Sequence, residues 1–231
     1  MMKTGGIGTR PLVMEPTFRD RKQAGKALAQ RVAKSVTARN ILVLGLPRGG
    51  VPVAYEIAQR FERELDVFIV RKLGLPGHEE LAIGAIASGG VRVLNESLVR
   101  ELQLSPSLIT RIAQREQIEL ERREQLYREG RPRIPVQHRN IILVDDGLAT
   151  GVSMKAAAKA LRTEHPARII VAVPVAAQQT CDDFRADVDE IICLHTPAPF
   201  LGVGMWYEDF SQTSDAEVQC CLEQAARSPH H

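Results

Sequence analysis

The feature that most constrains the fold of this chain is a regular alternation between short apolar runs and longer amphipathic segments. Five runs are short, rich in Val, Ile and Leu, and typical of buried strands: Ile41–Gly45, Leu65–Val70, Asn140–Val144, Arg168–Val173 and Glu190–Leu194. Segments with apolar residues at helical spacing lie between them, at Val51–Arg63, Thr150–Glu164 and Ala176–Arg185. This alternation predicts an α/β fold of three layers, with a mainly parallel central sheet and helices on both faces.

Two stretches interrupt the pattern. The Gly-containing segment Arg71–Gly90 predicts a loop and a short hairpin whose return strand is Val91–Leu94. Asn95–Gly130 then predicts helices, because Asn95 can cap a first segment and Ser105-Pro106 supplies an N-cap followed by Pro at the first helical position. The many charges of the second helix, Ser107–Glu129, favour a solvated helix with ion pairs along it over a binding role.

A chain of 231 residues is long enough for one large α/β domain or two small ones. We expect a single domain over residues 1–231. Within it, residues 40–194 form the core, residues 95–133 a helical insertion, and residues 195–231 a small C-terminal hood and tail.

Composition excludes several classes of partner. The 30 basic and 28 acidic residues leave a net charge of +2, and only 4% of residues are aromatic, so neither a general positive field nor a base-stacking surface for nucleic acid is expected. Apolar runs are far shorter than the roughly 18 to 20 residues of a membrane helix. Residues Met1–Val13 lack the apolar segment of a secretory signal, and the four cysteines show no CxxC spacing. We therefore expect a cytoplasmic protein that binds neither membrane nor nucleic acid.

The most informative segment runs from Ile141 to Ser153. An apolar strand leads into two adjacent carboxylates, Asp145 and Asp146, and a turn of small residues then opens a helix. Backbone N–H groups at a helix N-terminus bind phosphate, and the hydroxyls of Thr150 and Ser153 add donors. Carboxylates beside such a turn suit a sugar phosphate, with a diol at one end and a phosphate at the other.

Competing motifs fit less well. The turn has no lysine where a Walker A loop needs one, and Gly202-Val203-Gly204 is not followed by the third Gly of a dinucleotide fingerprint. A receiver domain also has an acidic pair near strand ends but does not need the Thr-Gly turn. Two exposed aspartates that merely cap a helix remain the structural alternative.

The strand, the acidic pair and the Thr-Gly turn closely resemble the phosphoribosyl pyrophosphate (PRPP) signature of type I phosphoribosyltransferases. Leu46-Pro47-Arg48-Gly49-Gly50-Val51 resembles the pyrophosphate loop of that family, and Arg71-Lys72 is similar to the basic positions before its mobile catalytic loop. The resemblance covers about residues 40–194. A more specific likeness, to a bacterial subgroup of predicted phosphoribosyltransferases, extends through residues 203–210.

This resemblance implies roles for individual residues. Asp145 and Asp146 would hold the ribose 2′ and 3′ hydroxyls and belong, with Lys72, to the catalytic residues. The 5′-phosphate would be bound by the turn, which consists of Ala149, Thr150, Gly151, Val152 and Ser153. The pyrophosphate and its Mg²⁺ would be bound by Arg48, Gly49, Gly50, Arg71 and Lys72. The resemblance implies Mg²⁺ as the cofactor, held through the pyrophosphate, with Asp145 and Asp146 as further candidate ligands.

Two parts of the expected site are less defined. The interval after the second strand is long and largely helical, so the catalytic group of the mobile loop has three candidates, Lys72, His78 and Ser88. The hood over the acceptor would include Phe200, Trp206 and Tyr207, whose aromatic faces suit a planar base. The alternative is that Trp206 and Tyr207, with Phe210, pack the C-terminal tail onto the domain.

The expected function is therefore Mg²⁺-dependent transfer of the 5-phosphoribosyl group from PRPP to a small, nitrogenous, nucleobase-like acceptor, with release of pyrophosphate. The alternative is a regulatory protein that binds PRPP without turnover. Hydrolysis or phosphotransfer on a sugar phosphate is disfavoured, because adjacent aspartates do not match a DxDx[TV] nucleophile motif. By analogy with proteins of this fold, a homodimer is also expected.

Overall fold

The computed structural model describes residues 17–227. Residues 1–16 and 228–231, the two ends of the predicted single domain, lie outside the described residues, and so does the Met1–Val13 segment that was considered for a signal.

A five-stranded parallel sheet forms the centre of the molecule, as predicted. Its strands are β1 (Ile41–Gly45), β2 (Leu65–Val67), β6 (Asn140–Val144), β7 (Arg168–Val175) and β8 (Glu190–His195). Their order in the sheet is β2-β1-β6-β7-β8. β1 and β6 pair in register from Ile41 opposite Asn140 to Gly45 opposite Val144, so the chain leaves both strands at the same point of the carboxyl edge.

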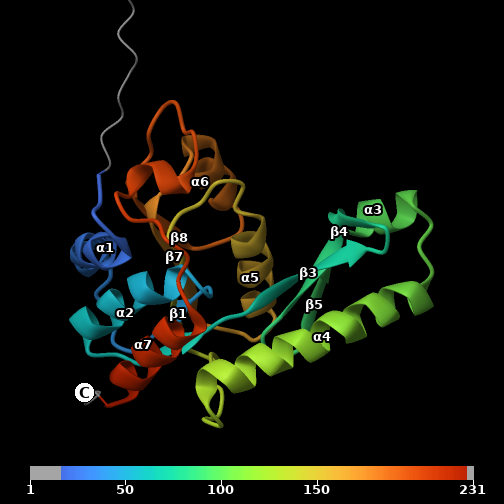
Figure 1. Cartoon of the computed structure of the whole chain (residues 1–231), viewed down its shortest axis with the longest axis horizontal. Helices are drawn as coiled ribbons and strands as arrows, with labels where there is room; N and C mark the ends of the chain where they lie inside the picture. The colour runs from blue at the N-terminus through green and yellow to red at the C-terminus, as the bar shows by residue number, and fades with distance from the viewer. Residues whose placement is uncertain (1–16, 228–231) are drawn as a thin grey trace, which may run out of the picture.

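Helices cover both faces of this sheet, which confirms the predicted layers (Figure 1). On one face α1 (Arg21–Ser35) and α2 (Gly50–Phe61) pack on Ile41 and Val43. On the other face α5 (Val152–Arg162) and α6 (Gln178–Phe184) pack on Leu42 and Leu44. Because consecutive strand residues point to opposite faces, strands that are buried on both sides are apolar throughout.

A second sheet corrects the prediction for residues 71–90. The predicted hairpin and its return strand Val91–Leu94 are confirmed, but strands take the place of the predicted loop. They belong to a three-stranded antiparallel sheet that consists of β3 (Val70–Leu75), β4 (His78–Ala87) and β5 (Val91–Leu94). Gly84 lies against the backbone of Val93 and leaves no room for a side chain, so glycine serves strand pairing here rather than a loop. The predicted strand Leu65–Val70 is accordingly split, and β2 and β3 belong to different sheets.

Two helices follow the second sheet, α3 (Glu96–Glu101) and α4 (Pro106–Arg128). Their predicted caps are confirmed, because Asn95 Oδ1 accepts from the Leu98 N–H and Ser105 Oγ accepts from the Leu108 N–H. Figure 1 shows these helices and the second sheet extending to one side of the molecule.

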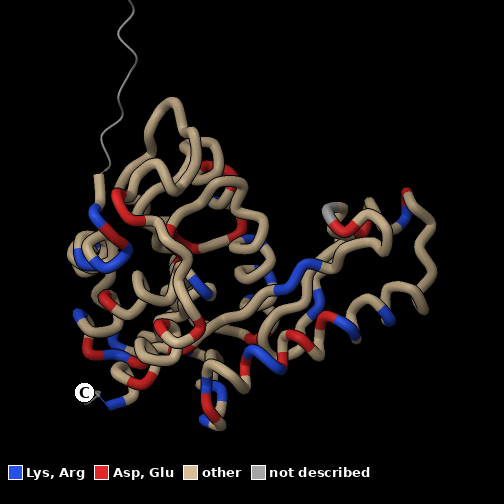
Figure 2. The backbone as a smooth tube through the Cα atoms, viewed as in Figure 1, with Lys and Arg blue, Asp and Glu red and all other residues tan. Residues whose placement is uncertain are grey.

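Acidic and basic residues follow one another closely along α4 (Figure 2). Glu119 accepts hydrogen bonds from Arg122 and Arg123, and these arginines hold the pKa of Glu119 down to about 2. This part of α4 therefore has the ion pairs that its composition predicts.

The two ends of the described chain form helices that the periodicity analysis did not predict. α1 begins after Asp20, whose side chain accepts from the Gln23 N–H. α7 (Asp215–Arg227) packs against α2 and α4. A short 3-10 helix, η1 (Val203–Trp206), precedes it. No helix within residues 17–227 has the length and apolar character needed to span a membrane.

Candidate functional site

The turn between β6 and α5 is open to solvent. Ala149, Thr150, Val152 and Ser153 are exposed, whereas Gly151 is buried with φ of 67° and serves as the N-cap of α5. A side chain at Gly151 would collide with the Phe184 ring, at 2.5 Å from Cε2, so only glycine fits this position. The N–H groups of the first helical turn have no partners within the helix and are available to an anion.

α6 supports this turn from behind. Thr180 Oγ1 donates a hydrogen bond of 2.7 Å to the Ala149 carbonyl. The turn is therefore held in place by a neighbouring helix while its outer side stays accessible.

The loop after β1 packs directly on the acidic pair. The Leu46 N–H donates to the Val144 carbonyl at 2.9 Å, which joins the two loops where the strands end. A Cβ at Gly50 would lie 2.8 Å from the Cα of Asp145, and a Cβ at Gly49 would overlap the Asp146 carboxylate. Both glycines therefore allow the close approach that brings the predicted pyrophosphate loop against the predicted ribose-binding acids.

Asp146 has a cationic partner from a distant part of the chain. Arg21, in the first turn of α1, donates from Nε to Asp146 Oδ2 at 2.8 Å, and the two side chains are only 12% and 16% exposed. Arg21 also donates to the Ser211 carbonyl at 2.7 Å, and its guanidinium lies 4.1 Å above the Phe210 ring. These contacts fix the orientation of the Asp146 carboxylate.

Burial sets the titration of the acidic pair. It raises the pKa of Asp145 well above its ordinary value, and repulsion from Asp146 adds to the effect. Burial also raises the pKa of Asp146, but the Arg21 guanidinium opposes this rise. The two carboxylates therefore differ, since Asp146 has an ion-pair partner and Asp145 accepts from the Asp146 N–H.

The predicted pyrophosphate-binding side chains do not all lie together. Arg48 approaches Asp215 at 3.7 Å and lines a small cavity of about 170 Å³ with Arg122, Arg123 and Tyr127. Arg71 and Lys72, in β3, line a larger cavity of about 730 Å³ together with Ser153. The structure thus brings Arg71 and Lys72 to the start of α5, whereas Arg48 points to α4 and α7.

The other two candidates for the mobile-loop group differ in accessibility. Ser88 is fully buried, and its hydroxyl accepts from the Ile69 N–H. His78 is exposed at the beginning of β4. Of these two side chains, only that of His78 is accessible from solvent.

The aromatic residues of the predicted hood lie in different surroundings. Tyr207 is 4% exposed, its hydroxyl donates to the Asp146 carbonyl at 2.6 Å, and its ring contacts Phe18 and Phe210. Trp206 is half-buried in η1, and Phe200 is half-buried in the preceding loop. Tyr207 therefore packs the end of the chain onto the acidic pair, and the role of the three residues in acceptor binding stays a prediction.

Sequence reasoning missed two features of this region. Arg21 lies in a helix that was not predicted, although Asp20 is an N-cap signal at its start. Arg111 and Arg115 of α4 line the same cavity as Lys72, although they were assigned to a solvated helix face. The order of residues along the chain does not indicate either juxtaposition.

No cluster of three or more His, Cys, Asp or Glu side chains that could enclose a metal ion occurs within the described range 17–227. Carboxylate oxygens are nonetheless the donors that Mg²⁺ prefers, and Mg²⁺ commonly binds through one or two carboxylates and substrate phosphates. The donor set of Asp145 and Asp146 fits that mode of binding.

Known proteins are similar to this chain in sequence and in fold. A family model described as "Phosphoribosyl transferase domain" matches residues 18–207. Two Mycobacterium tuberculosis proteins, from strains CDC 1551 and H37Rv, are named as phosphoribosyl transferases and are 46% identical over 210 residues, which is 91% of this chain. The match covers 47% of each, so the chain spans about half the length of these relatives.

A solved structure is also similar over nearly the whole chain. The crystal structure of TT1426 from Thermus thermophilus superposes with a TM-score of 0.80 at 42% identity, over 90% of this chain and 98% of that one. Together with the parallel sheet, the acidic pair and the Thr-Gly turn, these matches show that the chain belongs to the phosphoribosyl transferase domain family.

Proposed function

We propose that this protein transfers the 5-phosphoribosyl group from PRPP to a nitrogenous, nucleobase-like acceptor and releases pyrophosphate. The observation that carries the proposal is the meeting of three elements at one edge of the sheet. These are the half-buried acidic pair, the exposed Thr-Gly turn at the start of α5, and the Gly49-Gly50 loop packed on the acids.

Each element suits one part of PRPP. Carboxylate oxygens accept hydrogen bonds from the ribose 2′ and 3′ hydroxyls, and the carboxylate of Asp146 is already oriented by Arg21. The N–H groups at the start of α5 and the hydroxyls of Thr150 and Ser153 suit the 5′-phosphate. The Gly49-Gly50 loop, packed on the acids, suits the pyrophosphate, and Lys72 supplies positive charge near the turn.

In the reaction, the bond between C1 of the ribose and the pyrophosphate oxygen breaks and its electron pair stays on the pyrophosphate. The acceptor nitrogen supplies the new pair to C1 and loses its proton. The role of the chain is to orient both reactants and to neutralise the charge that develops on the leaving group. Members of this family generally use Mg²⁺ with PRPP, and the bound ion would share in that neutralisation.

Two measurements test the proposal. Titration calorimetry with PRPP in the presence of Mg²⁺ should detect binding that the Asp145→Asn, Asp146→Asn double variant loses, while circular dichroism should show that the variant remains folded. Incubation with PRPP and a panel of nucleobases should release pyrophosphate, and chelation of Mg²⁺ should stop this release. PRPP binding without turnover on any acceptor would favour the regulatory alternative, and undiminished PRPP affinity in the double variant would refute the assignment.

A further inference from the structure

A cavity of about 730 Å³ is lined by residues of α4 and of the second sheet. It lies within the range of 300 to 1,000 Å³ that is usual for small-molecule sites. Four basic and two acidic side chains line it, namely Arg71, Lys72, Arg111, Arg115, Glu79 and Glu116. Ser153, from the first turn of α5, lines it too, so the cavity adjoins the turn proposed for the 5′-phosphate.

Only one of these basic residues is neutralised by a close partner. Arg71 donates to Glu116 from Nε at 2.9 Å and from Nη2 at 2.6 Å. Lys72, Arg111 and Arg115 are exposed, and none of them has a hydrogen bond or ion pair to another residue within 17–227. Glu79 also lines the cavity, and hydrogen bonds from backbone N–H groups lower its pKa, with a smaller contribution from Arg115.

The remaining arginines of α4 contrast with this pair. Arg122 and Arg123 bind Glu119, and Arg128 binds Asp66. Arg111 and Arg115 are one helical turn apart, a spacing at which like charges repel unless an anion lies between or beside them. Two unpaired cations of α4 and a third of β3 thus line one space that is large enough for a ligand.

We propose that Arg111 and Arg115, together with Lys72, bind the pyrophosphate of PRPP. The inference rests on the proposed function and names the cations of its leaving-group site. The 5′-phosphate is served by the turn before α5, and Arg48 is directed to Asp215 in a separate cavity. The unpaired cations of the larger cavity, Lys72, Arg111 and Arg115, are therefore available to bind the pyrophosphate.

The chemistry requires cations at this place. Negative charge builds on the pyrophosphate as its bond to C1 breaks, and guanidinium groups remain protonated and offer several donors to phosphate oxygens. The helical insertion, which lies between the second and third predicted strands, would in this way add cations to the leaving-group site beside Lys72.

The test uses titration calorimetry of the full chain with Mg²⁺ and three probes, which are PRPP, inorganic pyrophosphate and ribose 5-phosphate. In the Arg111→Gln, Arg115→Gln variant, loss of charge-assisted hydrogen bonds should weaken PRPP and pyrophosphate binding by about tenfold or more. Ribose 5-phosphate, which lacks the leaving group, should bind within about twofold of the wild type. Gln is a good helix former, so α4 should persist, and circular dichroism checks this.

A matched control removes the same charge elsewhere. Arg31 of α1 and Arg60 of α2 are exposed, and the Arg31→Gln, Arg60→Gln variant should bind all three probes as the wild type does. Equal weakening of all three probes in the α4 variant, or an equal effect of the control, would show a general electrostatic effect and overturn the inference.

Failure of this inference differs from failure of the proposed function. A wild type that binds PRPP, with an α4 variant that binds PRPP and pyrophosphate equally well, overturns only the role of Arg111 and Arg115. A wild type that binds neither PRPP nor ribose 5-phosphate contradicts the proposed function, and the inference fails with it.

Discussion

Arg21 Nε lies 2.8 Å from Asp146 Oδ2, so the first turn of α1 contacts an acid 125 residues further along the chain. The same guanidinium contacts Ser211 and Phe210 in the loop before α7. One half-buried side chain therefore links the first helix of the described residues, the loop before α7 and the candidate ribose-binding acid.

This contact predicts that Arg21 is a positioning residue for Asp146. Arg21→Ala should weaken PRPP binding by about tenfold or more, because a hydrogen bond to a charged group contributes about 1.5–3 kcal/mol. Arg21→Lys keeps the charge and should recover part of the affinity, and added guanidinium ion should partly rescue Arg21→Ala. Arg19→Ala serves as the control, since Arg19 is exposed and its side chain pairs with neighbouring Asp20. Titration calorimetry measures the affinities, and a wild-type affinity in Arg21→Ala would contradict the prediction.

Burial of Asp145 predicts a conflict between stability and function. A raised pKa means that ionisation of Asp145 destabilises the fold, so its unfavourable contribution is absent at low pH and grows as the pH rises through the folded pKa. Asp145→Asn should therefore raise the melting temperature at pH 7, where each 1 kcal/mol corresponds to roughly 2–4 °C. The gain should shrink as the pH falls toward the ordinary pKa of 3.8.

Thermal unfolding between pH 4 and pH 8 measures this effect, and calorimetry should find weaker PRPP binding in the same variant. Asp183→Asn is the control because Asp183 is exposed on α6, and its melting temperature should not change with the same pH dependence. A melting temperature of Asp145→Asn below that of the wild type at pH 7 would count against the argument.

The close packing of Gly49 on Asp146 predicts that this position accepts no side chain. In Gly49→Ala the new methyl group would overlap Asp146 Oδ2, and overpacking of this kind costs about 1–3 kcal/mol. The carboxylate should move, and PRPP affinity should fall with it. Gly130→Ala is a suitable comparison, because φ is +80° there but nothing lies within 4 Å of the added methyl group. It should lower stability by about 1–2 kcal/mol and leave PRPP binding intact. Equal PRPP binding by wild type and Gly49→Ala would show that the loop has room to spare.

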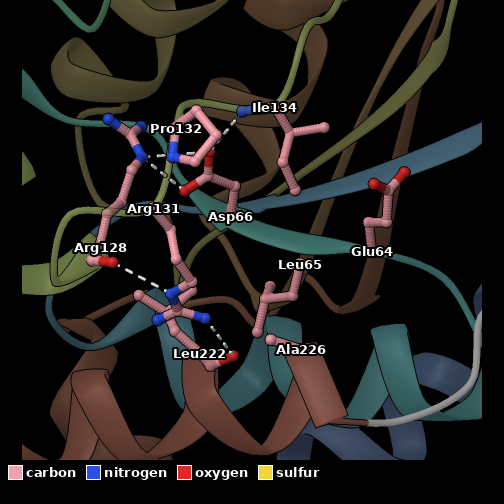
Figure 3. Close-up of a pocket in the computed structure, with 9 residues that line it drawn as sticks. All are labelled: Glu64, Leu65, Asp66, Arg128, Arg131, Pro132, Ile134, Leu222 and Ala226. Atoms are coloured by element: carbon pink, nitrogen blue, oxygen red, sulfur yellow. Dashed lines mark hydrogen bonds and ion pairs between the residues drawn. The ribbon is translucent and has the colours of Figure 1, made fainter.

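A buried ion pair lies away from the candidate site, at the edge strand β2 (Figure 3). Arg128 donates to both oxygens of Asp66 at 2.9 and 3.2 Å, and the two residues are 7% and 3% exposed. Arg128→Ala should cost about 3–5 kcal/mol, because it leaves a buried carboxylate without its partner. The Asp66→Leu, Arg128→Met double variant should cost less than Arg128→Ala alone. Urea denaturation measures the free energy of unfolding of each variant. A double variant that loses as much stability as Arg128→Ala, or more, would contradict the expected coupling between the two side chains.

The central sheet could be predicted from the sequence because strands that are buried on both faces must be apolar throughout. Ile41–Gly45 and Asn140–Val144 have that composition, and both boundaries are those of β1 and β6. The second sheet could not be predicted in the same way. Its strand Val70–Leu75 is only partly buried, contains Arg71, Lys72 and Gly74, and bulges near its end, so neither continuous burial nor strict alternation marks it.

The residues of the candidate site also differ in how far the sequence could predict them. Asp145, Asp146 and the Thr-Gly turn are contiguous in sequence, so their proximity follows from a single strand and the loop after it. Arg21, Arg111 and Arg115 come from distant helices, and their approach to the site depends on how those helices pack. A single sequence shows that these residues are charged but not where they lie in the folded structure.

The separation of β2 from β3 has a mechanical consequence. Only Phe68 and Ile69 connect the two strands, and no strand pairing within residues 17–227 joins the five-stranded sheet to the three-stranded one. A tilt of one sheet against the other would keep the strand pairings within each sheet, yet it would alter the distance from Lys72 to Ser153. The width of the cavity lined by α4 and β3 therefore depends on how side chains pack around Phe68 and Ile69. Small substitutions at these two residues should change the size of the ligand that the cavity accepts.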